Sequence, residues 1–457
     1  MSNNSKASER INALLDANSF VEIGGKMTAR ATDFNLEPKN TPADGVVTGY
    51  GVIDDKLVYV YAQDASVMGG SIGEMHAKKI CALYDLAMKV GAPVIGLIDC
   101  AGLRLQEGTD ALNAFGEIYK KQALASGLIP QISAIFGNCG GGLAILSAIS
   151  DFTFMVDSAK LFVNSPNALD GNYEAKCDTA SALFQGAECG TVDFVVSEND
   201  IFEKLRKLFA MLPANNEDND TFEDCTDDIN RGCAFCENAT DLIAQIADNN
   251  AYVEVKADYA KDITCGLIKL NGNTVGVVAN GETKLSPYGC VKAADFVNFC
   301  DAFDIPVLTL TDVDGFDATV ESEKKMAKAA AKLTYAFANA TAPKVNVIVG
   351  KAFGSAYNVM NSKALGCDMT FALDTASIGM MDAKLAAKVM YAGEGNDVIS
   401  AKAGEYDELQ NSADAAARRG YVDTVIGSAD IRKYVIGAFE MLYTKREENP
   451  LKKHGTV

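Results

Sequence analysis

The chain has 457 residues, 48% of them hydrophobic, which is long enough for two or three domains with sizeable cores. Its 61 acidic and 41 basic residues leave a net charge of −20, which argues against a general nucleic-acid-binding protein. The polar start MSNNSKASER lacks the apolar core of a signal peptide, and polar residues interrupt the longest apolar run, so no transmembrane helix is expected. Twelve scattered cysteines lack the spacing of a disulfide scaffold, and we expect a cytoplasmic protein with free thiols.

The first half of the chain alternates strand and helix patterns. The Val- and Tyr-rich stretch 56–64 predicts a strand, and apolar residues at helical spacing predict a helix over 74–90. A buried strand over 93–99, a helix over 111–126 and a strand over 130–137 follow. This β-α-β-α-β order predicts an α/β core with a mostly buried sheet.

The stretch GNCGGGLA, residues 137–144, places three consecutive glycines between a strand and a helix. A nucleotide P-loop needs Lys and Ser or Thr after the last glycine, whereas Leu143 and Ala144 follow Gly142. A dinucleotide fingerprint belongs after the first strand of its fold, and these glycines come later. An oxyanion hole needs only two convergent backbone N–H groups and a close approach, which glycine permits. An ordinary tight turn is the structural alternative.

The second half repeats the order of the first. GAPVIGLIDCAG at 91–102 matches DIPVLTLTDVDG at 304–315, and IPQISAIFGNCGGGLA at 129–144 matches APKVNVIVGKAFGSAY at 342–357, both 213 positions later. Two matches in one register predict two homologous domains, 1–240 and 241–457. The acidic, polar stretch 215–241 between the matches predicts a solvated linker or insertion. Because the glycine turn recurs, we expect two paired sites that each stabilise a carbonyl oxygen.

Candidates for side-chain catalysis are few. The two histidines are His76, at the start of a helix, and His454, in the tail, and neither completes a convincing triad. Glu107 and Glu117 either act as acid and base or face solvent, and their spacing does not decide. One CxxC, Cys233 to Cys236, is weak support for zinc, and we expect no metal. This scarcity suits chemistry carried by backbone amides and by the reactants.

The chain resembles the carboxyltransferase subunits of biotin-dependent acyl-CoA carboxylases and decarboxylases. The resemblance is carried by GGSIGEMHAKKICALYDLAMKVGAPVIGLIDCAGLRLQEG and GNCGGG in the first half, and by DIPVLTLTDVDGF, GKAFGSAYNVM and LDTASIGMMDAKLAAKVMY in the second. It implies a crotonase-like (ClpP/crotonase) fold in each domain, with acyl-CoA bound by the first and biotin by the second. It also implies active sites formed between two subunits, in a dimer or hexamer.

The resemblance further implies carboxyl transfer between biotin on a carrier protein and the α-carbon of a short-chain acyl-CoA. By resemblance, Gly141 and Gly142 hold the thioester enolate, while Ser355 and Ala356 hold the ureido oxygen of biotin. The partners implied are an acyl-CoA, a biotin carboxyl carrier protein, and a biotin carboxylase or a membrane decarboxylase subunit; no nucleic acid is expected.

Further binding residues follow from the same resemblance. Around the second turn they are Phe353, Gly354 and Asn358, and in the loop 101–108, which resembles the lining of the acyl-CoA pocket, they are Gly102, Arg104 and Gly108. Arg104 is a charge partner for CoA or, equally, one half of a structural ion pair. Lys78 and Lys79 are weaker candidates, with a solvated helix face as the alternative.

The chain departs from the family pattern at several places. Ser355 stands where a second glycine is usual, and Asp314, in DGFDATVESEKK, stands where proline is usual. The stretch after Pro166 is shorter than in relatives. These departures keep two alternatives open: a divergent non-catalytic structural subunit, and a crotonase-type acyl-CoA hydratase.

Overall fold

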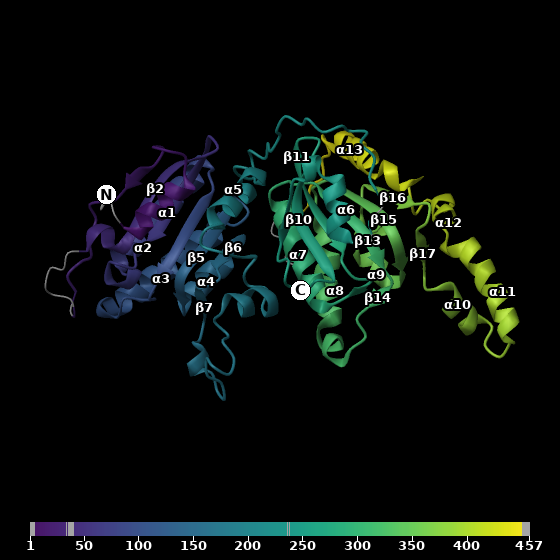
Figure 1. Cartoon of the computed structure of the whole chain (residues 1–457), viewed down its shortest axis with the longest axis horizontal. Coiled ribbons are helices and arrows are strands. Elements are labelled where there is room, and N and C mark those ends of the chain that lie inside the picture. The colour runs from purple at the N-terminus through teal and green to yellow at the C-terminus, as the bar shows by residue number, and fades with distance from the viewer. Residues whose placement is uncertain (1–4, 33, 35–40, 235, 237, 450–457) are drawn as a thin grey trace. The chain divides into compact units, whose positions relative to one another are not determined.

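The computed structural model describes residues 5–32, 34, 41–234, 236 and 238–449. The chain divides into two compact units, unit 1 (Met1–Asp220) and unit 2 (Thr221–Val457). Each unit has its own sheet of eight strands with helices packed against it (Figure 1). None of the described helices is long and apolar enough to cross a membrane.

The sheet of unit 1 has the strand order β1-β2-β3-β4-β5-β6-β8, with β7 beside β5. Strands β1 to β3 pair antiparallel and the others pair parallel. The strands are β1 (Val21–Ile23), β2 (Val46–Ile53), β3 (Lys56–Gln63), β4 (Val94–Cys100), β5 (Gln131–Gly140), β6 (Phe152–Val156), β7 (Lys160–Phe162) and β8 (Phe194–Val196). The helices are α1 (Lys6–Leu14), α2 (Glu74–Val90), α3 (Gly108–Ala125), α4 (Gly142–Ile149) and α5 (Ile201–Met211).

The sheet of unit 2 has the order β9-β10-β11-β13-β15-β16-β18, with β17 beside β15. The strands are β9 (Tyr252–Val255), β10 (Ile263–Leu270), β11 (Asn273–Asn280), β13 (Val307–Val313), β15 (Lys344–Phe353), β16 (Met369–Leu373), β17 (Ser377–Gly379) and β18 (Thr424–Ile426), and β12 (Lys284–Leu285) pairs separately with β14 (Gly315–Phe316). The helices are α6 (Ala239–Ile246), α7 (Pro287–Ala302), α8 (Val320–Asn339), α9 (Gly354–Val359), α10 (Ala383–Met390), α11 (Asn396–Tyr406), α12 (Ala413–Arg418) and α13 (Ile431–Leu442). The order matches that of unit 1 strand for strand, which confirms the α/β fold with two homologous domains.

A buried lysine ties the same two elements together in each unit. Lys79 in α2 donates to the carbonyl oxygen of Val46, the first residue of β2. Lys292 in α7, 213 positions later, donates to the carbonyl oxygen of Ile263, the first residue of β10, at 2.8 Å. Burial lowers the pKa of Lys79 to about 8. Lys79 therefore does not belong to a solvated helix face, which excludes that alternative at this position.

The boundary between the units lies after Asp220, about twenty residues before the expected one at 240. From residue 221 on, the acidic stretch packs on unit 2: the backbone N–H of Cys233 donates to Ala429 O at 3.1 Å, and buried Arg432 donates to Asp228 O at 3.2 Å. Lys269 Nζ reaches Thr221 O at 2.5 Å. This part of the stretch is therefore not a free linker: its backbone carbonyls accept hydrogen bonds from buried cations of unit 2, while most of its described side chains are exposed.

In unit 1, the titration of one buried carboxyl group should make the free energy of unfolding depend on pH. Burial raises the pKa of Asp151 to about 7 from an ordinary 3.8, and Asp151 Oδ2 accepts the backbone N–H of Gln131 at 2.7 Å. Between these two pH values the folded state holds a proton that the unfolded state has lost, so stability should fall as pH rises from about 4 to about 7. Chemical denaturation over this range should show a smaller decline in Asp151→Asn, and equal pH slopes would contradict the prediction.

Candidate functional site

The first glycine turn joins β5 to α4. Gly141 has φ +63° and ψ −127°, a conformation that side-chain-bearing residues rarely adopt. Its N–H donates to Phe162 O in β7 at 2.8 Å and is therefore engaged in the sheet. Gly142 is the first residue of α4, where backbone N–H groups have no partner within the helix. Of the two residues expected to hold the thioester enolate, Gly142 lies at the open end of a helix, whereas the N–H of Gly141 already has a partner in Phe162 O.

Two aromatic side chains of α3, Phe115 and Tyr119, pack against Gly142. Tyr119 Oη donates to Gly142 O at 2.6 Å, and the rings of Phe115 and Tyr119 lie 5.3 Å apart. A Cβ added at Gly142 would lie 2.6 Å from Tyr119 Oη and 3.0 Å from a ring carbon of Phe115. Glycine is therefore required here by close packing. Tyr119 was missed in the sequence, where the aromatic pair four residues apart in a helix was the available signal.

Arg104 lies inside unit 1. Its side chain is fully buried, with NH1 2.5 Å from Asp44 Oδ1 and 2.8 Å from Glu107 Oε1. NH2 donates to Ser71 O at 2.8 Å. The guanidinium joins three loops, and of the two interpretations of Arg104 the structure favours the structural ion pair over the contact with CoA. Gly102 and Gly108 have φ +105° and +52°, and an added Cβ at either would meet open space.

The same cluster accounts for two other candidates. His76 is buried, its Nδ1 lies 3.0 Å from Asp44 O, and burial lowers its pKa to about 3, so it is neutral. Glu107 Oε2 accepts the N–H of Glu74 at 2.6 Å, at the start of α2. Glu117 is exposed on α3. Glu107 and Glu117 therefore do not form an acid–base pair. His454 lies outside the described residues.

The second glycine turn joins β15 to α9. Gly354, the counterpart of Gly141, has φ +61°, whereas Ser355 lies within α9 and needs no positive φ. The serine that replaces the usual glycine thus stands at a position where a Cβ is accommodated.

Two cavities adjoin this second turn, and Gly354 and Ser355 line both. The first cavity has a volume of about 490 Å³ and the second about 660 Å³. The first is also lined by Lys284, Asp314, Gly315, Phe316, Lys351, Phe353, Ala356, Met380, Met381, Asp382 and Leu385. The second is also lined by Tyr357, Asn358, Ser362, Lys363, Ala364, Ile378, Gly379, Met380, Gln410, Ala416, Arg419, Gly420 and Tyr421. The structure therefore brings together Phe353, Gly354, Ser355, Ala356 and Asn358 around one turn.

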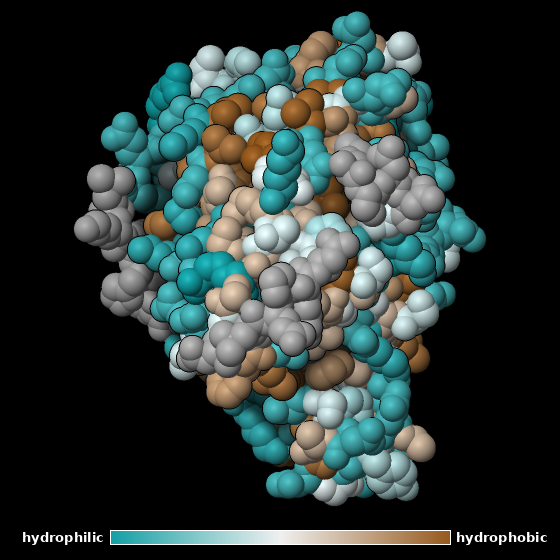
Figure 2. All heavy atoms as spheres, turned by 90° about the vertical axis from the view of Figure 1, so that its left-hand side faces the viewer, coloured by the Kyte–Doolittle hydropathy of each residue, from teal (hydrophilic) through white to brown (hydrophobic). Residues whose placement is uncertain are grey.

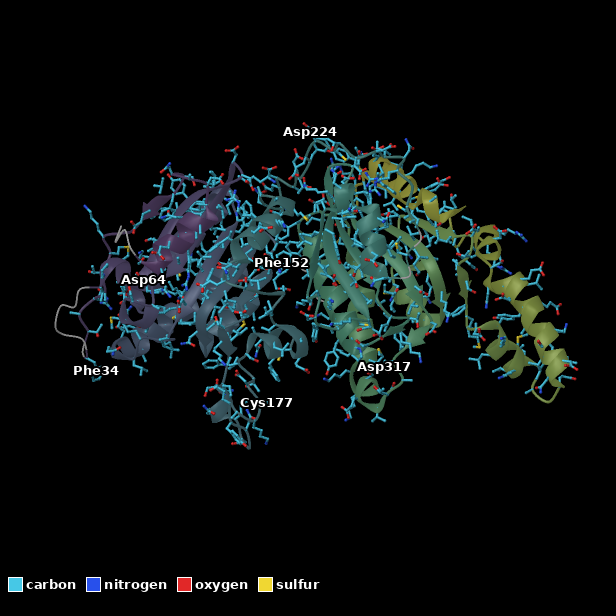
Figure 3. The ribbon with its side chains drawn as sticks, in the orientation of Figure 1. Phe34, Asp64, Phe152, Cys177, Asp224 and Asp317 are labelled. Atoms are coloured by element: carbon cyan, nitrogen blue, oxygen red, sulfur yellow. The ribbon has the colours of Figure 1, made fainter. Side chains whose placement is uncertain are left out.

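The loop that departs from the family pattern forms a wall of the first cavity. The N–H of Asp314 donates to Thr283 O at 2.7 Å, and its Oδ2 lies 3.3 Å from Lys351 Nζ. Asp317, labelled in Figure 3, accepts the hydroxyl of Thr319 at 3.0 Å and that of Ser322 at the start of α8. Local hydrogen bonds thus fix this loop.

The cysteines offer no metal site within the part of the chain that the structure describes, where no group of three or more His, Cys, Asp or Glu side chains could hold an ion. Cys233 Sγ donates to Gln245 O at 3.7 Å, and Cys236 Sγ donates to Ala234 O at 3.5 Å. All twelve cysteines are free thiols, and Cys177 lies on the segment that projects from unit 1 in Figure 3.

Comparison with known proteins identifies relatives over nearly the whole chain. The family described as carboxyl transferase domain matches residues 2–457. The propionyl-CoA carboxylase beta chain of Roseobacter denitrificans is 40% identical, over 99% of this chain and 93% of its own length. The methylmalonyl-CoA decarboxylase subunit alpha of Propionigenium modestum is 38% identical, over 99% and 92%. The crystal structure of transcarboxylase 12S, described as a hexamer assembly with hydrolysed methylmalonyl-coenzyme A bound, has a TM-score of 0.95 at 36% identity and covers 98% of this chain and 92% of that one.

These findings agree with the two matched sheets. The likeness to transcarboxylase 12S extends across both units, so the expected pair of crotonase-like domains is confirmed. The resemblance stated from the sequence is confirmed as well, by a family match from residue 2 to residue 457. The chain belongs to the carboxyl transferase domain family.

Proposed function

We propose that this protein transfers a carboxyl group between biotin on a carrier protein and the α-carbon of a short-chain acyl-CoA of the propionyl- and methylmalonyl-CoA class. The observation that carries the proposal is the pair of matched strand–glycine–helix turns, one in each unit. The printed names of the relatives, propionyl-CoA carboxylase beta chain and methylmalonyl-CoA decarboxylase subunit alpha, support the substrate class. Biotin supplies the ureido nitrogen that carries the carboxyl group.

Backbone amides stabilise the charge that develops during transfer. As the α-carbon of the acyl-CoA gives up its proton to the ureido nitrogen and bonds to the carboxyl carbon, negative charge develops on the thioester oxygen. In this proposal the Gly142 N–H donates to that oxygen, and Tyr119 and Phe115 fix the backbone of Gly142. The first unit is then the acyl-CoA side, with Gly102 and Gly108 giving its loop a close approach to substrate.

The second unit is the biotin side in this proposal. The N–H groups of Ser355 and Ala356 donate to the ureido oxygen, whose negative charge rises when the carboxyl group leaves. Both residues line the cavity of about 490 Å³, which Phe353 and Gly354 also line. Asn358 lines the neighbouring cavity, where we place the acyl group's contact with this unit.

Partners follow from the same proposal. The chain acts with a biotin carboxyl carrier protein, with a biotin carboxylase or a membrane decarboxylase subunit, and with further copies of itself. Exposed apolar side chains support self-association: α10 and α11 extend from the body of unit 2 (Figure 1) and expose Leu385, Val389, Met390 and Val398. Apolar areas also interrupt the hydrophilic face of unit 1 seen in Figure 2.

An assay of substrates tests the proposal. Purified protein is supplied with malonyl-, methylmalonyl- or glutaconyl-CoA and with free biotin or a biotinylated carrier, and release of CO2 is measured. We expect decarboxylation that depends on biotin and is fastest with methylmalonyl-CoA. Hydration of an enoyl-CoA without biotin would support a hydratase instead. A folded protein without transfer activity under all these conditions would support a structural subunit.

Tyr119→Phe tests the support behind Gly142. The change removes only the hydroxyl that donates to Gly142 O, so we expect kcat/KM for methylmalonyl-CoA to fall by about three- to tenfold, as for the loss of one neutral hydrogen bond. Tyr173→Phe, an exposed tyrosine of unit 1, serves as the matched control and should leave the rate unchanged. An unchanged rate in both variants would show that the hydroxyl does not support the turn during turnover.

A further inference from the structure

In each unit, three side chains lie together near the carboxyl ends of three neighbouring parallel strands: an amide, an aspartate and an apolar residue. Asp99 is the next-to-last residue of β4 in unit 1, as Asp312 is of β13 in unit 2, and both face a glycine, since an added Cβ at Gly137 or Gly350 would meet the carboxylate. Gln63 Oε1 accepts the N–H of Asp99 at 3.3 Å, and Asn280 Oδ1 accepts the N–H of Asp312 at 3.0 Å. The third position is Phe136 in unit 1 and Val349 in unit 2, 213 positions later.

An arginine covers this place in unit 1. Arg10 of α1 is buried, and its NH1 donates to Asp99 Oδ2 at 2.9 Å. Its guanidinium carbon lies 4.4 Å from the centre of the Phe136 ring. The carboxylate of Asp99 is therefore neutralised by a cation that belongs to the same chain.

The corresponding helix of unit 2 has no such arginine. Helices α1 and α6 end alike: the N–H of Leu15 donates to Ile11 O, and the N–H of Ala247 donates to Ile243 O. Counted back from these ends, the position of Arg10 is occupied by Leu242. A cavity of about 270 Å³ remains there, lined by Cys236, Ala239, Leu242, Asn280, Leu310, Asp312 and Val349. The cavity thus lies where the guanidinium lies in unit 1.

Two polar groups of this cavity lack a partner that their counterparts in unit 1 have. Asp312 Oδ1 accepts the N–H of Lys351 at 2.7 Å, but no cation of the described residues forms an ion pair with its carboxylate, unlike that of Asp99. Asn280 is 8% exposed, and its Nδ2 is buried without a hydrogen-bond partner. Because the N–H of Asp312 donates to Asn280 Oδ1, the amide group cannot rotate to bring its Nδ2 to another partner. In unit 1 the matching amide nitrogen, Gln63 Nε2, has a hydrogen-bond partner in His76 Nε2 at 3.3 Å.

We propose that this cavity of unit 2 binds a small organic cation that carries an oxygen acceptor beside its ammonium group, as in an amino alcohol. The ammonium group pairs with Asp312, in the place that Arg10 takes beside Asp99. The oxygen accepts the free N–H of Asn280, and the carbon atoms pack against Leu242 and Val349. The proposal is independent of the carboxyl-transfer proposal, since none of these residues lines the cavities beside Gly354.

Thermal unfolding of the full-length protein with ethanolamine tests this proposal. At pH 7.5 we expect a saturable rise in Tm of a few degrees at concentrations about tenfold above the dissociation constant. Propylamine, which lacks the oxygen, should give a smaller rise, and sodium chloride at equal ionic strength should give none. Equal rises with all three would show an ionic-strength effect and overturn the proposal.

Two variants separate the site from the bulk of the protein. Asp312→Asn should abolish the ethanolamine effect, whereas the exposed control Asp397→Asn in α11 should keep it. Leu242→Arg restores the arrangement of unit 1 and should raise Tm without ligand while removing the response to ethanolamine. If Leu242→Arg fails to fold, Asp312→Asn still decides: an undiminished response in that variant would overturn the proposal.

Discussion

Arg104→Ala is expected to lower the free energy of unfolding of unit 1 by about 3–5 kcal/mol, as for loss of one partner from a buried ion pair. The change leaves two buried carboxylates, those of Asp44 and Glu107, without their shared cation. It also removes the hydrogen bond that Arg104 NH2 donates to Ser71 O. Guanidinium denaturation followed by circular dichroism measures the loss.

The pH dependence of this variant gives a second readout. Burial already raises the pKa of Asp44 in the presence of Arg104, and removal of the cation should raise it further. Protonation would then relieve the unpaired charge, so the deficit of Arg104→Ala should shrink as pH falls toward 5. Lys207→Ala, which removes an exposed ion pair with Glu203, is the control and should cost less than about 1 kcal/mol. Similar costs for the two variants would contradict the buried-cluster interpretation.

Ser355→Pro is expected to lower kcat for carboxyl transfer by about 10²–10³-fold, the usual loss for one oxyanion donor. Proline removes the N–H proposed to donate to the ureido oxygen. The position lies in the first turn of α9, where proline is tolerated, so the fold should persist. Steady-state kinetics with methylmalonyl-CoA and biotin measure the loss, and an unchanged Tm confirms folding.

The glycine variant decides whether the N–H or the hydroxyl of Ser355 is needed. Ser355→Gly keeps the N–H and restores the usual residue of the family, so it should retain most activity. Gly142→Pro, at the matching place in unit 1, should also lose activity, but its added Cβ would lie 2.6 Å from Tyr119 Oη, so its Tm should fall as well. Wild-type activity in Ser355→Pro would refute the donor assignment, and loss of activity in Ser355→Gly alone would move the role to the hydroxyl.

The repeat was the strongest predictor of the fold. Matches of Asp99 with Asp312 and of Gly141 with Gly354 predicted two homologous α/β domains, and the two sheets have the same strand order. The positive φ recurs at the glycines that match, and Ser355 falls at a position that needs none. Spacing sufficed here because strand–turn–helix geometry is local.

Contacts between distant segments could not be predicted in the same way. The N–H of Gly141 donates to Phe162 O, in a short strand 21 residues later, and nothing near Gly141 signals that pairing. Arg104 was open to two interpretations because its partner Asp44 lies sixty residues earlier. The acidic stretch after Asp220 looked solvated by composition, whereas its backbone serves buried Arg432. Burial is decided by tertiary partners that composition does not reveal.

The position of the boundary after Asp220 bears on how the chain could be divided into two genes. A break after residue 220 leaves Arg432 with Asp228 O and with Asp248, whose Oδ1 lies 2.5 Å from its NH2. A break after residue 240 would separate Asp228 from the same guanidinium. We therefore expect co-expressed polypeptides 1–220 and 221–457 to assemble into a working protein more readily than 1–240 and 241–457. Division of the chain into two polypeptides is thus compatible with the contacts of Arg432 when the break follows residue 220, and it disrupts them when the break follows residue 240.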